Sequence, residues 1–245
     1  MDHDGFMDQK KEQMKSKIII VISLLCLLNG MGMVAQEGIT GYTLKKGEVL
    51  DVLFLTQKQE KDSLFKDYVR VAFPIAIQMG YKNLTGRQIV KSTQGNIEPQ
   101  NVVFAKWDNR NIRERFIQEI ETHVPDFHQQ RRNIWSIFNL TYYEMSKDVS
   151  FAMDKDKYYT ITAYWKKDED KFNAFVNTFD KVVKRFGGTH ILELRDGISP
   201  FMYHYRPDYF VMTEWEDKKQ FELFYQENLK MDTEGLLNVN QFVIE

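Results

Sequence analysis

The stretch YFVMTEWE, residues 209–216, has a counterpart 108 positions earlier in the chain, the stretch NVVFAKWD at residues 101–108. Both stretches are largely apolar without alternation between polar and apolar side chains, and both end on a tryptophan followed by an acidic residue. A strand with this pattern is typical of a position that is buried on both faces. We therefore expect each stretch to lie inside a sheet that is covered by helices on one side and by something else on the other.

The similarity extends outward from these two strands. After an apolar strand at residues 158–165, the sequence predicts a helix at 171–186 that ends at Gly187-Gly188, then strands at 189–195 and 208–215. A second helix at 218–228 and a strand at 237–244 follow, which gives the order βαββαβ. Residues 49–143 follow the same order. The two helices that match each other, one in each copy, show apolar side chains at the spacing of one helix face. In the second copy these are Phe172, Phe175, Val176, Phe179, Val182, Val183 and Phe186, and in the first copy Phe65, Tyr68, Ala72, Ile75 and Met79.

The predicted organisation is a signal peptide (1–35), a linker (36–48), a first repeat (49–143), a second linker (144–157) and a second repeat (158–245). The two segments share one order of elements, and tryptophan and phenylalanine occur at matching positions in both. This favours a true repeat over coincidence between two α+β segments. The simplest cover for each doubly buried sheet is the sheet of the other copy. We therefore predict an α+β fold in which two repeats pack sheet to sheet, with four principal helices outside. Because the second sheet is supplied in the same chain, we expect a monomer.

The composition is that of a globular protein. The chain has 245 residues, of which 43% are hydrophobic, and its net charge is −2. This is enough apolar material for a sizeable core. A near-neutral balance gives no electrostatic argument for binding nucleic acid.

The N-terminal segment has the pattern of a secretory signal peptide. Lys15 and Lys17 precede an apolar run at residues 18–28, and Ala35 stands before a plausible cleavage site at Gln36. We expect a periplasmic or secreted protein, whose contact with the membrane is made only through the uncleaved signal; an uncleaved anchor is the alternative. Cys26, the single cysteine, lies inside the signal, so the mature chain is expected to lack disulfides and thiolate ligands.

The sequence contains no recognisable motif for a metal or a cofactor. A glycine-rich phosphate loop, a Gly-x-Ser-x-Gly elbow and a His-Glu-x-x-His helix are all missing from the sequence. His123 and His128 are separated by a segment that contains Pro125, and proline breaks the helical register that a metal pair would need. We expect solvated loop histidines there, and neither a metal nor a cofactor.

The strongest cluster of titratable side chains is in the second copy. His190 begins one predicted strand, while Tyr203, His204 and Arg206 lead into the next one. An imidazole beside a phenol and a guanidinium can exchange protons or bind an anion. These four residues are the candidate ligand site, placed between the second sheet and the opposing one. The alternative is an ordinary aromatic-rich hairpin with exposed histidines.

Large aromatic side chains also allow two interpretations. They are suited to line a cavity for a flat organic molecule, or to fill the core between the sheets. We favour the core. The side chains concerned are Trp165, Tyr164, Trp135, Phe104 and Phe210.

The segment RPDYFVMTEW (206–215), followed by FELFY (221–225), resembles a small bacterial family of barrel domains without an assigned activity. That family is similar to antibiotic-biosynthesis-type monooxygenases within the dimeric α+β barrel superfamily of ferredoxin-like domains. The resemblance concerns core residues, so it implies the fold more than the chemistry. Relatives in the superfamily include cofactor-free monooxygenases and haem enzymes. Haem users of this fold place a ligating histidine on a helix, and the predicted helices here carry none, which counts against haem.

Two functions follow as hypotheses. The first is an exported barrel that binds a small organic molecule or has a structural role. The second is a cofactor-independent monooxygenase-like enzyme that acts on an aromatic or phenolic substrate. A cavity containing His190 or His204 would favour the enzyme, and a fully packed centre would favour the barrel without catalysis.

Overall fold

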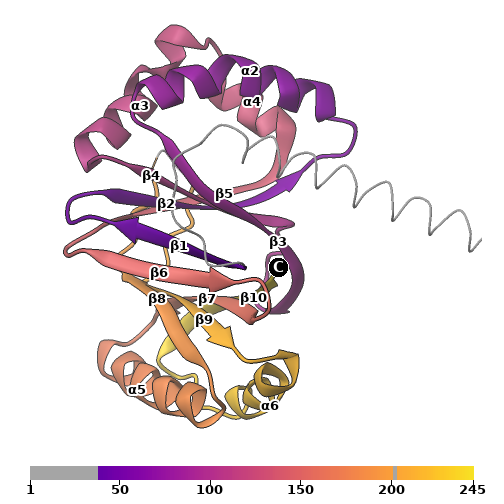
Figure 1. Cartoon of the computed structure of the whole chain (residues 1–245), viewed down its shortest axis with the longest axis vertical. Helices are drawn as coiled ribbons and strands as arrows, with labels where there is room; N and C mark the ends of the chain where they lie inside the picture. The colour runs from indigo at the N-terminus through magenta and orange to yellow at the C-terminus, as the bar shows by residue number, and fades with distance from the viewer. Residues whose placement is uncertain (1–37, 201–202) are drawn as a thin grey trace, which may run out of the picture.

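The computed structural model describes residues 38–200 and 203–245, and its elements form two halves that share one order (Figure 1). The first half contains β2 (Val49–Gln57), α2 (Asp62–Gln78), β3 (Lys82–Gln94), β4 (Asn101–Trp107), α3 (Arg110–His123), α4 (Phe127–Ile134) and β5 (Trp135–Glu144). The second half contains β7 (Tyr158–Lys166), α5 (Glu169–Arg185), β8 (Thr189–Arg195), β9 (Tyr209–Trp215), α6 (Lys218–Asn228) and β10 (Leu236–Ile244). The predicted βαββαβ order is therefore confirmed, with one additional helix, α4.

Each half builds an antiparallel sheet with the same strand order. The first sheet runs β5-β2-β4-β3 and the second runs β10-β7-β9-β8. In both, the last strand of the half lies beside the first, and the third lies between the first and the second. The two matched strands, β4 and β9, each lie inside their sheet and contribute side chains both to the core between the sheets and to the core under the helices, which explains why they are largely apolar.

The two sheets are joined through β3 and β10. The first part of β3, Lys82 to Gln88, pairs with β4, and its second part, Ile89 to Gln94, pairs with β10, so one continuous sheet of eight strands results. The outer edges also meet. Tyr142 of β5 and Ile198, just after β8, exchange two backbone hydrogen bonds of 2.8 and 2.9 Å.

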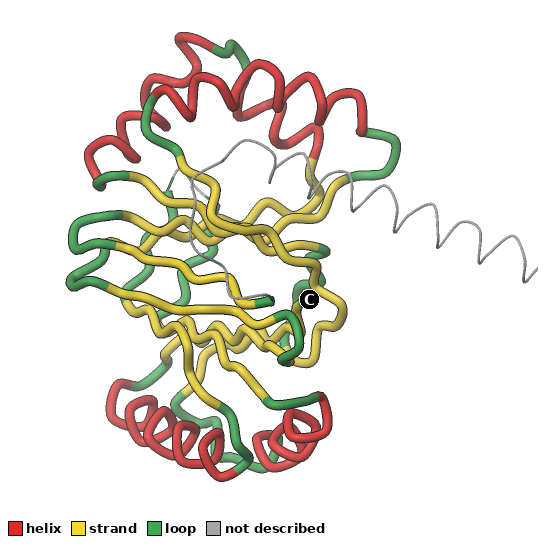
Figure 2. Tube along the Cα trace, viewed as in Figure 1, coloured by secondary structure: helices red, strands yellow, loops and turns green. Residues whose placement is uncertain are grey.

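The core lies between the two sheets, which form adjacent layers with the helices outside them (Figure 2). Rings from opposite halves meet there: the Phe54 and Phe242 ring centroids lie 5.0 Å apart, and those of Phe104 and Phe210 lie 6.4 Å apart. The prediction that the sheets face each other is confirmed, and Phe104 and Phe210 are core residues as favoured. Trp165 is half-buried against this core.

The other two aromatic residues lie elsewhere. Tyr164 packs under α5, and Trp135 packs under the helices of the first half.

Helices cover the outer face of each sheet. In α5 six apolar side chains of the predicted stripe are buried, including Phe179, which is 1% exposed. Gly187 ends this helix with φ at +77°, and Gly188 lies so close to Trp215 that a Cβ would stand 2.7 Å from its ring. These contacts explain the double glycine. Asp217 caps α6 by accepting from the Gln220 amide at 2.9 Å.

The two segments that we expected to be linkers each contribute a strand instead. β1 (Ile39–Leu44) and β6 (Val149–Asp154) pair antiparallel with each other. Two alternating side chains of each strand are buried in the core between the sheets: Tyr42 and Leu44 from β1, and Phe151 and Met153 from β6. The ribbon thus covers one side of the barrel. In each strand the apolar and polar side chains alternate over only six residues. The composition of these short segments therefore resembles that of a linker.

The predicted signal peptide lies outside the described residues. In the described part of the chain, no helix has both the length and the apolar character that crossing a bilayer requires.

Candidate functional site

Helix α4 shapes the site, and it has no counterpart in the second half, where α6 leads directly to β10. The helix begins after Pro125 at Asp126, whose φ is +60°. It packs against β5 and α2. The buried side chains of α4 include two polar ones, His128 and Arg131. A helix that buries a histidine and an arginine beside a sheet places titratable groups where a ligand is shielded from water.

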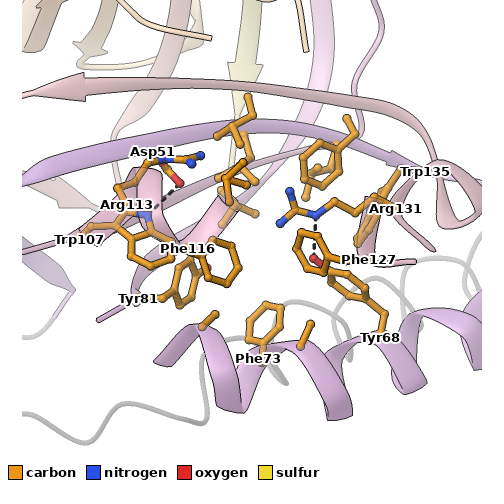
Figure 3. A pocket seen from close by; sticks show the side chains of 18 of the residues that line it. Asp51, Tyr68, Phe73, Tyr81, Trp107, Arg113, Phe116, Phe127, Arg131 and Trp135 are labelled. Carbon is orange, nitrogen blue, oxygen red and sulfur yellow. Dashed lines mark hydrogen bonds and ion pairs between the residues drawn. The ribbon is translucent and has the colours of Figure 1, made fainter. Parts of the chain in front are cut away.

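A cavity of about 70 Å³ lies between the first sheet and its helices. Figure 3 shows aromatic side chains between two arginines, Arg113 of α3 and Arg131 of α4. We call it the inner cavity. Its wall is formed by Asp51, Leu53, Leu55, Phe65, Tyr68, Ala72, Phe73, Ala76, Tyr81, Val103, Trp107, Arg113, Phe116, Ile117, Phe127, Arg131, Trp135, Phe138 and Leu140.

A second and larger space, about 550 Å³, opens beside α4 and the start of β5. We call it the outer pocket. Three residues border both spaces: Arg131, Trp135 and Phe138. Arg131 therefore stands at the boundary between the inner cavity and the outer pocket. The remaining wall of the outer pocket consists of Ile97, His128, Arg132, Ser136, Ile137, Asn139 and Tyr203.

Arg131 is a buried cation, 8% exposed, whose hydrogen-bond partners are phenols. Its Nε donates to Tyr68 Oη at 2.8 Å, and its Nη1 donates to Tyr203 Oη at 2.9 Å. The guanidinium carbon lies 4.0 Å from the Phe127 ring centroid. Burial works to lower the pKa of Arg131, but the two phenols outweigh it and raise that pKa, so the group stays charged. Within residues 38–200 and 203–245, no acidic side chain forms an ion pair with Arg131.

Arg113, at the other side of the inner cavity, is balanced by a carboxylate. Its Nε donates to Asp51 Oδ1 at 3.0 Å, and both side chains are almost completely buried. The second oxygen, Oδ2, accepts from Trp107 Nε1 at 3.0 Å. Asp51 therefore neutralises Arg113 and has a donor on each oxygen.

His128 and Tyr203 meet at the outer pocket, where the phenol oxygen lies 3.5 Å from His128 Nδ1. Burial first, and then the charges of Arg131 and Arg132, lower the pKa of His128 to about 4. The imidazole is neutral at physiological pH, so it has one nitrogen able to accept a proton. The arrangement places a proton acceptor, a phenol and a fixed cation on one wall.

The structure distributes the four residues of the predicted second-copy site among different surroundings. His190 packs under α5, with Nε2 3.2 Å from Asp180 Oδ1 and Nδ1 2.9 Å from Thr213 Oγ1. Its ring stacks on Phe179. This is the helix side of the second sheet, not the side that faces the first sheet, where we had placed the site.

The other three residues lie in the loop before β9. His204 is exposed, with φ at +53°, and Arg206 is also exposed, with Nε donating to the Gly197 carbonyl at 3.0 Å. Tyr203 reaches across to Arg131 of the first half. Of the four residues predicted to form a site, Tyr203 lines the outer pocket.

One expectation about histidines is wrong. His128 lies in a helix and is 5% exposed, although we expected a solvated loop; His123 is exposed as expected, but it is the last residue of helix α3. The predicted helices at 171–186 and 218–228 contain no histidine, as stated, and His128 lies in α4, a helix that was not predicted. Pro125 precedes the N-cap of α4, so it stands before the helix and does not interrupt it.

Sequence reasoning also missed Asp51, Arg113 and Arg131. One signal was present: Asp51 is a lone charge in the apolar strand VLDVLFL, at residues 49–55. A charge in such a strand must find a buried partner. The arginines gave no signal because both lie in helices rich in charged residues.

No protein-family model matches the chain, and no curated protein matches it in sequence. Among solved structures, an anthrone oxidase-like protein is similar at 13% identity and a TM-score of 0.49, over 83% of this chain and 94% of that one. A mutant chlorite dismutase from Candidatus Nitrospira defluvii is similar at 8% identity and 0.49, over 82% and 93%. A candidate monooxygenase from Lactobacillus acidophilus NCFM is similar at 11% and 0.37, over 82% and 94%. At these values the likeness concerns the course of the chain and carries no argument about chemistry.

Proposed function

We propose that the protein binds a small organic anion with a flat apolar body in the outer pocket, with Arg131 as its counter-charge. The observation that carries this proposal is the buried guanidinium whose hydrogen bonds go to the neutral phenols of Tyr68 and Tyr203. Removing an ion from water costs several kcal/mol, and phenols supply hydrogen bonds without an opposite charge. A carboxylate or phenolate at Arg131 would offset that cost.

The shape and walls of the outer pocket support an aromatic ligand. Its volume of about 550 Å³ is in the range typical of small-molecule sites. Phe138 and Tyr203 stand with ring centroids 5.0 Å apart, and Trp135 lies 5.1 Å from Phe138. Aromatic rings beside a cation favour a flat ring that carries an acidic group.

The environment of His128 supports a second candidate function, cofactor-independent oxygenation of a phenolic substrate. The imidazole on the pocket wall can accept the proton of a bound phenol because Arg131 beside it stabilises the phenolate that forms. The resulting anion would be held by Arg131 and would react with dioxygen. Conversion of one CH₂ group to C=O with dioxygen as the oxidant releases one water, so the reaction balances without another reductant.

We further propose that the protein is exported to the periplasm or medium. The support is the N-terminal pattern: two lysines, the apolar run at residues 18–28 and Ala35 before Gln36. Closure of the barrel within the chain supports a monomer, since the seam between β3 and β10 and the contact between Tyr142 and Ile198 both form in cis.

Native mass spectrometry of protein purified from its own source, together with calorimetric titration of benzoate, tests the binding proposal. We expect a retained anionic compound or measurable benzoate binding. Arg131→Met should weaken benzoate binding tenfold or more, because an ionic hydrogen bond is lost. Arg185→Met is the control, since that arginine is exposed in the second half and pairs with Glu227.

The proposal fails if benzoate does not bind and no ligand is retained, or if Arg131→Met binds as well as the native protein. A retained haem, recognised by its visible absorption, would contradict it as well. Dioxygen uptake with a phenolic substrate that stops in His128→Gln would favour the oxygenase.

A further inference from the structure

The guanidinium of Arg113 includes a fully buried nitrogen that has no hydrogen-bond acceptor among the described residues. Its Nη1 is buried without a partner in the described part of the chain, although the residue is only 1% exposed and borders the inner cavity. Asp51 is occupied on both oxygens, by Arg113 Nε and by Trp107 Nε1. A buried donor left without a partner destabilises a fold, and the effect is larger when the donor is charged. Such a donor at the wall of a cavity points to an acceptor that enters the cavity.

The charge around the inner cavity limits what that acceptor is. The charged groups on its wall are Asp51, Arg113 and Arg131, which sum to one positive charge. The phenols of Tyr68 and Tyr81 add no negative charge, because burial raises the pKa of both. One negative charge therefore balances the inner cavity, and the ligand acid group at Arg131 supplies it. Arg132 of the outer pocket is exposed, so solvent screens its charge. A second carboxylate beside the neutral Asp51–Arg113 pair would exceed that balance.

The size of the inner cavity limits the shape of the group that reaches Arg113. Its volume is about 70 Å³, against about 150 Å³ for an engineered apolar cavity that holds benzene. A ring does not fit, while a short arm of a few heavy atoms does. The larger outer pocket shares Arg131, Trp135 and Phe138 with it, so one molecule can occupy both spaces.

We infer that the ligand is a monoanionic keto acid: its acid group meets Arg131, its ring lies in the outer pocket, and a short arm ends in a neutral carbonyl that accepts from Arg113 Nη1. This inference rests on the proposed function and adds the second polar group. Arg113 is a specificity-determining residue in this arrangement, because it distinguishes a carbonyl from a hydrocarbon of the same shape. A hydrogen bond to a buried cation is worth about tenfold in affinity.

Matched pairs of benzoates test the inference by calorimetry on the full chain. Each pair has an ortho arm with a ketone (acetyl, acetonyl or 3-oxobutyl) and its isostere, in which C=CH₂ replaces C=O. In the native protein, we expect at least one keto benzoate to bind about tenfold tighter than its isostere. In Arg113→Lys, which keeps a cation beside Asp51 but lacks Nη1, that ratio should fall to about one. Arg110→Lys, on the exposed side of the same helix, is the control and should keep the ratio.

A second variant tests the inference even if Arg113→Lys does not fold. Asp51→Asn keeps the shape but leaves the Arg113 charge unbalanced, so an arm that ends in a carboxylate should gain over the ketone. No keto preference at any arm length, a preference that survives Arg113→Lys, or no gain of the diacid in Asp51→Asn overturns the inference. The proposed function fails separately, if no benzoate binds or if Arg131→Met leaves the affinity of the isosteres unchanged.

Discussion

The indole Nε1 of Trp107 donates to Asp51 Oδ2 over 3.0 Å, across the first sheet from β4 to β2. The second half repeats this contact: Trp215 Nε1 donates to Thr160 Oγ1 over 2.9 Å, from β9 to β7. The two halves therefore preserve a hydrogen bond while the acceptor changes from a carboxylate to a hydroxyl.

One of the residues that pack on each tryptophan changes with the acceptor. Arg113 lies 6.0 Å from the Trp107 ring, and Phe221, 108 positions later, lies 5.7 Å from the Trp215 ring. The first half thus places an ion pair where the second half places a phenyl ring. The same arrangement of strands and helix accommodates the ion pair in one half and the phenyl ring in the other. Buried charge occurs at this position in the first half alone.

Asp51→Ala should destabilise the protein more than Thr160→Ala does. The first change leaves Arg113 buried without its counter-charge, which typically costs about 3–5 kcal/mol. The second removes a neutral acceptor and leaves one indole donor unpaired, for about 1–3 kcal/mol. Urea denaturation of the two variants measures both losses. Equal losses would show that the ion pair between Asp51 and Arg113 is not formed in solution.

Stability should fall between about pH 6.5 and pH 4 by an amount that depends on His128. An unfolded histidine binds a proton below about pH 6.5, whereas the pKa of His128 in the folded state is about 4. In that interval the unfolded chain holds more protons, so acidification favours unfolding. The contribution is at most about 3.5 kcal/mol, from about 1.4 kcal/mol for each pH unit over the interval.

Denaturant midpoints at pH 7 and pH 4.5, for the native protein and for His128→Gln, isolate this contribution. Other groups titrate in both proteins, so the difference between them reports His128. A native protein that loses no more stability than the variant would contradict the burial of the imidazole.

Phe179→Ala should reduce the free energy of unfolding by about 3–5 kcal/mol, because the large ring at the centre of α5 leaves a cavity. Phe179 is 1% exposed and contacts Tyr164, His190 and Phe224. The matching position in α2 is Ala72, which is 2% exposed, so the first half packs a smaller side chain there. Thermal and urea unfolding provide the measurement. A negligible change in the midpoint would mean that this helix face does not pack on the sheet in solution.

The protein should be a monomer in solution. The eight-stranded sheet closes on itself through Tyr142 and Ile198, and the ribbon of β1 and β6 covers its side. Light scattering coupled to size exclusion determines the mass directly. A stable dimer at micromolar concentration would show that an edge left by this closure is still available for pairing.

Processed protein should begin near Gln36 and should take up no thiol label, since Cys26 leaves with the signal. N-terminal sequencing of protein recovered from the periplasm or medium of a Gram-negative host tests this. Recovery of residues 18–28 in a membrane fraction would favour the uncleaved anchor.

The fold could be predicted from the sequence where packing requires apolar side chains at a regular spacing. The strand at Thr189–Arg195 and the helix at Lys218–Asn228 have the predicted bounds. Both bury apolar side chains at a regular spacing, which is the signal that sequence reasoning uses. β1 and β6 carried such a period too, but over six residues each, which is too short to stand out.

The site could not be predicted because it depends on departures from that rule. The eight residues of α4, FHQQRRNI, bury a histidine and an arginine. Their sequence therefore lacks a continuous apolar stripe and resembles that of a polar loop. Pairs such as Asp51 with Arg113 join residues 62 positions apart, and no local pattern specifies which charges meet. Only the fold brings Tyr203 of the second half to Arg131 of the first.

The seam between β3 and β10 has a consequence for synthesis on the ribosome. β10 follows every other described element in the chain, yet it pairs with a strand made about 150 residues earlier, as in the pairing of Phe242 with Ser92. Until β10 emerges, the second part of β3 is an open strand edge on a nearly complete first half. Such an edge invites pairing with another nascent chain. The segment Ile89–Gln94 is therefore where a chaperone would bind most usefully during translation.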